Sequence, residues 1–87
     1  MSDPVERNRD VLARQQYEID RVEKGWVWVY KVGDRLNQEY FPIEDFTPAD
    51  TQHPQFVPGL RFESILYRVD YTDGDRKLVA SLVCEFK

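Results

Sequence analysis

The sequence predicts a single α+β domain, in which an N-terminal helix packs on a four-stranded antiparallel sheet made of two hairpins. Three observations predict this fold. Residues 3–24 carry the start and stop signals of a helix, residues 26–41 and 62–86 each read as two strands around a glycine-containing turn, and residues 42–61 hold four of the five prolines. At 87 residues, the chain has room for one domain only.

The helix over residues 3–24 is predicted from its two ends. Asp3 is a suitable N-cap, and Glu6 follows three residues later in a capping-box-like pattern. Gly25 is placed to end the helix in a left-handed conformation. The apolar stripe is narrow, so we expect the helix to cover only part of a sheet. Its members recur every seven residues, at Val5, Leu12 and Ile19.

The second hairpin, residues 62–86, carries the clearest turn signal. Asp73-Gly74 suits a two-residue hairpin loop. Such a loop would place Val69 opposite Leu78, and turn and hydrophobic pattern would then agree on the register. The same face would also carry Ile65, Tyr67, Ala80 and Leu82. In the first hairpin, residues 26–41, Gly33-Asp34 would form the turn.

Residues 42–61 are predicted to form a long strap without a central strand, because proline removes a backbone donor and restricts the residue before it. Thr47 could cap one short helical turn at Pro48. A loop of this length in a small domain is either a structural cover or a functional segment. Phe46 and Phe56 would be its anchors.

The resulting order is helix, hairpin, strap, hairpin. It resembles the order of elements in cystatin-like and monellin-like proteins, in which a curled sheet wraps one helix. The resemblance is in element order only, and it implies nothing about activity. The alternative fold is a small SH3-like barrel with an added helix.

The inventory of reactive side chains favours a protein without enzymatic activity. The chain has one histidine, His53, and one cysteine, Cys84, which cannot together build a structural zinc centre. Asp70, Asp73 and Asp75 lie near a glycine, but they lack the closing glutamate of a calcium loop. We therefore predict no catalytic, cofactor-binding or metal-ligating residue, and no cofactor.

Charge and hydropathy restrict the partners and the compartment. The net charge is −4 and no lysine- or arginine-rich run is present, which disfavours binding to nucleic acid. A single cysteine fits a reducing compartment. No apolar stretch approaches the ~20 residues of a membrane span, and the N-terminus does not resemble a signal peptide. We expect a cytoplasmic protein that does not contact a membrane.

The strand WVWVY in the first hairpin has two apolar faces. Trp26, Trp28 and Tyr30 share one face and the smaller Val27 and Val29 share the other. Bulk favours packing the tryptophans inward, because small domains need large anchors. The other set would then lie outside as a candidate interface. The predicted protein-binding residues are Val27, Val29, Leu66, Val79 and Val83, together with Phe46 and Phe56 of the strap.

The hypothesis that follows is a small protein-binding module that acts as an inhibitor, adaptor or accessory subunit. Its partner would be another protein, either a second copy of the chain or a different one. One alternative is a small-ligand-binding protein or enzyme with a pocket between helix and sheet, and with His53 or Tyr17 at its mouth. A second alternative is a single-stranded nucleic-acid binder that stacks bases on the sheet aromatics.

Overall fold

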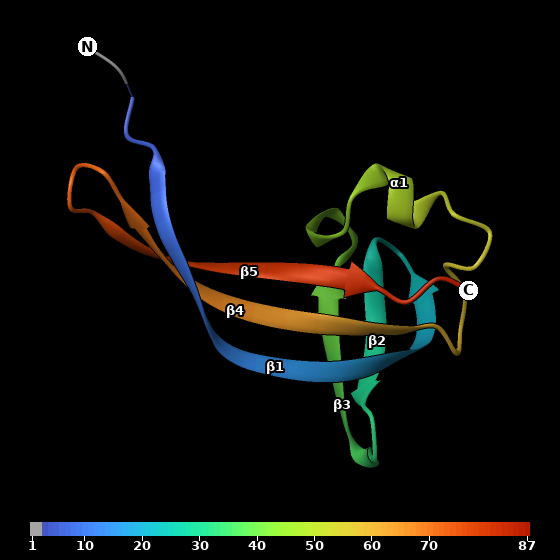
Figure 1. Ribbon diagram of the computed structural model, residues 1–87. Coiled ribbons are helices and arrows are strands. Elements are labelled where there is room, and N and C mark those ends of the chain that lie inside the picture. Colours follow the sequence, from blue (N-terminus) through green and yellow to red (C-terminus); the bar gives the residue numbers. More distant parts are fainter. Residues whose placement is uncertain (1–2) are drawn as a thin grey trace.

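The computed structural model describes residues 3–87 and contains one antiparallel sheet of five strands (Figure 1). The spatial order of the strands is β3-β2-β1-β4-β5. Two short helical turns, η1 and α1, lie in the long connection between β3 and β4. The bounds are β1 Glu6–Glu23, β2 Trp26–Lys31, β3 Asp34–Pro42, η1 Ile43–Asp45, α1 Pro48–Thr51, β4 Arg61–Tyr71 and β5 Arg76–Cys84.

The predicted helix over residues 3–24 is wrong, and with it the α+β class and the four-stranded sheet. This segment forms β1, which pairs with β4 from Glu6 to Glu18 and with β2 from Tyr17 to Glu23. Local helix signals are a weak prior that tertiary pairing overrides. The cystatin-like order and the SH3-like alternative both included this helix, so neither describes the chain.

Gly25 lies in the loop between β1 and β2. It has the positive φ that the sequence predicts, +80°, but Lys24 before it also has a positive φ of 54°. Two successive residues of this kind form a tight hairpin loop, and Glu23 pairs with Trp26 across it. The glycine therefore reverses the chain between two strands instead of ending a helix.

β1 is long and irregular. Its pairing shifts between Val11 and Ala13 on the β4 side, and between Ile19 and Arg21 on the β2 side. Such bulges bend a strand and change which side chains face the core. In Figure 1 β1 accordingly sweeps along the whole sheet as one curved strand.

The core lies on one face of the sheet, which we call the inner face, and the opposite face is the outer face. Val27 and Val29 of β2 and Phe62 of β4 are fully buried there. The strap of residues 43–60 covers them, and the Phe46 ring lies edge-on to Phe62 with centroids 5.1 Å apart. The buried cluster is completed by Tyr17, Ile19, Phe56 and Leu60.

Backbone hydrogen bonds fix the strap over the inner face. The Ile19 N–H donates to the Leu60 carbonyl, and the Gly59 N–H donates to the Ile19 carbonyl, both at 2.8 Å. At its other end, the Ile43 N–H donates to the Gly25 carbonyl at 3.0 Å. Within the strap, the Thr47 hydroxyl accepts from the Asp50 N–H at 3.2 Å and caps α1. The strap is therefore part of the folded core, in the position that the predicted helix was expected to occupy.

The second hairpin is present, but its predicted register is wrong by one residue. The Tyr71 N–H donates to the Asp75 carbonyl, which closes a three-residue loop in which Gly74 has a φ of +86°. Val69 consequently faces Lys77 and not Leu78. A one-residue slip exchanges the two faces of a strand, so Leu78, Ala80 and Leu82 lie on the face opposite to Val69.

The molecule is elongated, with principal extents of 45 × 26 × 25 Å. The first half of β1, the second half of β4 and the start of β5 extend as a three-stranded arm away from the strap and from the β2–β3 hairpin (Figure 1). Within residues 3–87, no helix has the length and hydrophobicity needed to cross a membrane.

Candidate protein-binding surface

Four aromatic side chains form a cluster on the outer face of β2 and β3. Trp26, Trp28 and Tyr30 alternate with the buried valines of β2, and Tyr40 lies opposite Trp28 on β3. The Tyr40 ring is in contact with both tryptophans: its centroid lies 5.2 Å from that of Trp26 and 5.2 Å from that of Trp28. We call Trp26, Trp28, Tyr30 and Tyr40 the aromatic cluster.

The aromatic cluster is open to solvent, which corrects the prediction that the tryptophans pack inward. Trp26 is 40% exposed and Tyr40 is 57% exposed, while Trp28 and Tyr30 are half-buried. The physical reason is the strap. Its phenylalanines already fill the inner face, so only the small valines of β2 fit beneath them.

Two arginines lie over rings of the cluster. The Arg21 guanidinium lies 4.7 Å from the centroid of Trp28, and that of Arg35 lies 5.5 Å from the centroid of Tyr30. Both arginines also contact carboxylates. Arg21 lies 3.3 Å from Asp20 and 3.2 Å from Glu23, and Arg35 is paired with Glu18. The charges at the edge of the cluster are thus largely balanced within the chain.

A second apolar area occupies the outer face of the arm. Val69 and Ile65 are buried on this face, while Val83, near the end of β5 and outside the arm, is 48% exposed. Arg9 lies over the ring of Tyr67 and Lys77 over the ring of Tyr71. Both faces of the sheet are therefore apolar in part, although only the inner face is covered by the strap.

The structure separates the predicted protein-binding residues into two groups. Val27, Val29, Phe46 and Phe56 lie in the core, so they are not available to a partner, and the structure corrects that part of the prediction. Three others are not in the core. Val79 of the arm and Val83 near the end of β5 lie on the outer face, and Leu66 lies on the inner face, with Val79 and Leu66 half-buried.

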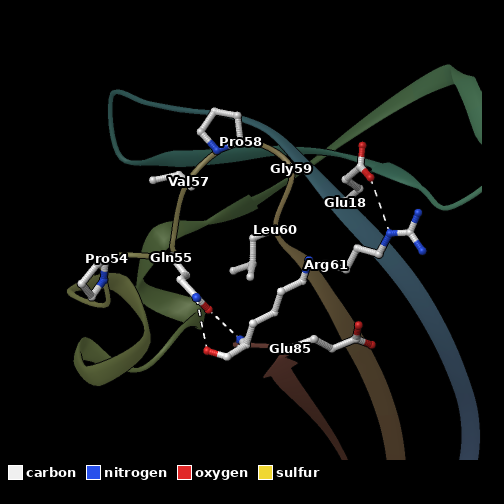
Figure 2. Close-up of a pocket in the computed structure, with 10 residues that line it drawn as sticks. Glu18, Pro54, Gln55, Val57, Pro58, Gly59, Leu60, Arg61 and Glu85 are labelled. Atoms are coloured by element: carbon white, nitrogen blue, oxygen red, sulfur yellow. Dashed lines mark hydrogen bonds and ion pairs between the residues drawn. The ribbon is translucent and has the colours of Figure 1, made fainter.

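A groove lies where the end of the strap meets the C-terminus (Figure 2). The Gln55 side chain closes one side of it, since it donates to the Lys87 carbonyl at 3.2 Å and accepts from the Lys87 N–H at 2.6 Å. Arg61 lies 3.6 Å from Glu18 on the other side. Neither His53 nor Tyr17 lines this groove, so it is not the pocket that the small-ligand alternative describes.

The two candidate reactive side chains are engaged in packing. Burial, and then the nearby carboxylate of Asp50, raise the pKa of the Cys84 thiol to about 11. The His53 ring stacks on Phe86 with centroids 3.8 Å apart, and its Nδ1 accepts from the Gln55 N–H at 3.0 Å. A protonated thiol is a poor nucleophile, so the arrangement offers no activated cysteine.

The described residues hold no group of three or more histidine, cysteine, aspartate or glutamate side chains arranged to bind a metal ion. No protein-family model, no curated protein and no solved structure matches the chain. The function must therefore be argued from the surface itself.

The sequence pattern predicts the aromatic cluster but assigns it to the wrong face of the sheet. The alternation of tryptophan and valine defines two faces but does not say which is inside. Phe46 and Phe56 in the strap would have decided it, because they compete with the tryptophans for the same inner face. Tyr40 was missed, since its position beside Trp28 depends on the pairing of β2 with β3.

Proposed function

We propose that the protein is a non-enzymatic protein-binding module whose contact surface is the aromatic cluster on the outer face of β2 and β3. The observation that carries the proposal is the exposure of Trp26 and Tyr40 beside Trp28 and Tyr30 on one sheet face. Tryptophan, tyrosine and arginine are the side chains that most often carry the binding energy of protein interfaces.

The rigidity of the cluster supports this role. β2 is paired on both sides, with β1 and with β3, so its backbone is held in place. The planes of the Trp26 and Tyr40 rings are at 88° to each other in an edge-to-face contact. The Arg21 guanidinium packs over the ring of Trp28. A surface that is ordered before binding loses less conformational entropy when a partner arrives.

Charge favours a protein over nucleic acid as the partner. Single-strand binders combine stacking aromatics with cations that are free to follow the phosphate backbone. Here Arg21 and Arg35 are each paired with carboxylates of the same chain, and the net charge is −4. Aromatic side chains beside neutralised arginines are better suited to a protein surface.

The biological role that fits is that of an inhibitor, an adaptor or an accessory subunit. Each of these roles needs a small rigid surface and no reactive group. We place this activity in the cytoplasm, because a half-buried free cysteine without a disulfide partner suits a reducing compartment. The partner is a second copy of the chain or a different protein.

The proposal is tested with the double variant Trp26→Ala/Tyr40→Ala. Affinity capture with mass spectrometry would identify the partner of the wild-type chain, and light scattering would show self-association. Loss of even one interface hot spot costs about 2 kcal/mol, so we expect binding to weaken at least about 30-fold. Neither side chain belongs to the buried core, so the double variant should keep the fold, which circular dichroism checks.

The matched control is Val83→Ser, which removes an exposed apolar side chain from β5, the opposite edge strand, on the same sheet face. It should leave partner binding at the wild-type level. Binding that survives the double variant, or that is lost only in the Val83→Ser variant, would contradict the assignment of the contact surface to the aromatic cluster.

A further inference from the structure

The aromatic rings on the outer face differ in whether a cationic side chain of the same chain lies over them. Trp28, Tyr30, Tyr67 and Tyr71 each have an arginine or lysine of the same chain over the ring. Among the described residues, no such cation lies over Trp26 or Tyr40, which are the most exposed aromatic side chains. Cation–π contacts within the chain therefore cover four rings of the outer face, whereas the adjacent rings of Trp26 and Tyr40 have none among the described residues.

The geometry of these two rings suits a cation. Their centroids are 5.2 Å apart and their planes stand at 88°, so the two rings form a corner. A cationic group in such a corner contacts one ring through its face while it remains close to the second ring. We call this pair, Trp26 and Tyr40, the aromatic corner.

Two carboxylates lie beside the aromatic corner. Glu23 lies opposite Trp26 in the β1–β2 pairing, and Asp20 precedes Glu23 on the same strand. These two carboxylates share the single guanidinium of Arg21, at 3.2 Å and 3.3 Å respectively. Because Glu23 shares this guanidinium with Asp20, its carboxylate is only partly neutralised and can attract a further cation.

We propose that the aromatic corner receives a lysine or arginine side chain of the protein partner, and that Glu23 provides the counter-charge. Arg21 over Trp28 shows the same contact within the chain, at 4.7 Å from the ring centroid. The inference rests on the proposed function and adds the chemistry of the partner: a protein surface that presents a basic side chain. It is consistent with the net charge of −4.

The test follows the two tryptophan indole N–H signals by nuclear magnetic resonance in the ¹⁵N-labelled protein. The probe is a short acetylated and amidated Gly-Arg-Gly peptide, and the control probe contains citrulline, the neutral isostere, in place of arginine. We expect a saturable shift of the Trp26 signal with the arginine peptide alone. The Trp28 signal should move less, because Arg21 already occupies its ring. A Trp28→Phe variant assigns the two signals.

Two variants locate the binding. Tyr40→Leu should abolish the shift of the Trp26 signal, while Glu23→Gln should weaken binding roughly two- to fivefold, as expected for one exposed charge pair. An equal response to the citrulline peptide, or no response of Trp26 to either peptide, would overturn the proposal. Neither result would remove partner binding at the aromatic cluster, so failure here is distinguishable from failure of the proposed function.

Discussion

Cys84 shows how a single side chain depends on its position in the fold. Its sequence position allows a reactive thiol, but the folded chain places it half-buried, next to Asp50. Burial disfavours the thiolate, and the carboxylate disfavours it further, so the pKa is raised from 9.0 to about 11. The thiol is therefore protonated across the physiological range, and this agrees with a structural role.

The raised pKa of Cys84 predicts slow alkylation. At pH 8 the folded protein should react with iodoacetamide roughly a hundredfold more slowly than the urea-unfolded chain, since the reagent attacks the thiolate and each pKa unit changes its fraction tenfold. Asp50→Asn should increase the rate by removing the negative neighbour. The rate is followed by mass spectrometry. Equal rates for the folded and unfolded chains would contradict the burial of the thiol.

The raised pKa of Cys84 also determines the direction in which the free energy of unfolding changes with pH. The folded-state pKa lies above the unfolded value of 9.0, so the folded state holds this proton more tightly. The stabilising contribution is complete below about pH 9 and is lost as the pH rises towards about 11.

At the scale of elements, β1 and the β4–β5 hairpin explain most of the difference between expectation and structure. β1 carries helix-like end signals, yet it is the central strand, because both of its edges find partners. In β4–β5, one additional loop residue, Thr72, moves the whole apolar set of β5 to the other face. Small changes in loop length thus have large consequences for which side chains are exposed.

The β4–β5 loop predicts a position-specific loss of stability. Gly74→Val should lower the free energy of unfolding by about 1–3 kcal/mol, because a β-branched residue is strained at a φ of +86°. An added Cβ would meet no atom within 4 Å, so the loss is one of backbone conformation and not of a clash.

The control is Gly74→Asn, since asparagine tolerates the left-handed region better than valine does. Its unfolding free energy, measured by urea denaturation, should fall less than that of the valine variant. Equal losses for both variants would contradict the assigned turn.

At the scale of the whole molecule, the chain is less compact than its length allows. A globular domain of 87 residues has a radius of gyration of about 12 Å, whereas this chain has 15.3 Å over its Cα atoms. The difference comes from the arm, which extends beyond the strap-covered core. The elongated shape places the aromatic cluster and the apolar area of the arm far apart on the outer face.

The elongated shape is directly measurable. Small-angle X-ray scattering should give a radius of gyration near 15 Å and a longest dimension near 45 Å for the monomer. Light scattering on the same sample gives the mass, which separates an extended monomer from a dimer. A monomer with a radius of gyration near 12 Å would show that the arm folds back on the core.

The sequence alone determined the features that are set by neighbouring residues. It located the β2–β3 and β4–β5 hairpins, because glycine-containing turns and alternating side chains act over a few residues. The predicted Gly33-Asp34 turn is nevertheless wrong by one residue, since Asp34 already pairs with Lys31 and the loop is Val32-Gly33. It also identified Phe46 and Phe56 as the anchors of a proline-pinned strap, because proline excludes a central strand there. Both phenylalanines are buried, as anchors should be.

Only the tertiary structure decided the identity of β1 and the orientation of the aromatic face. Whether residues 6–23 form a helix or a strand depends on partners that lie far away in the sequence, at β4 as well as at β2. Whether Trp26 or Val27 points inward depends on what else fills the inner face, and the strap fills it with phenylalanines. Long-range competition for one buried surface cannot be derived from local periodicity, because both faces of WVWVY are apolar and packing alone distinguishes them.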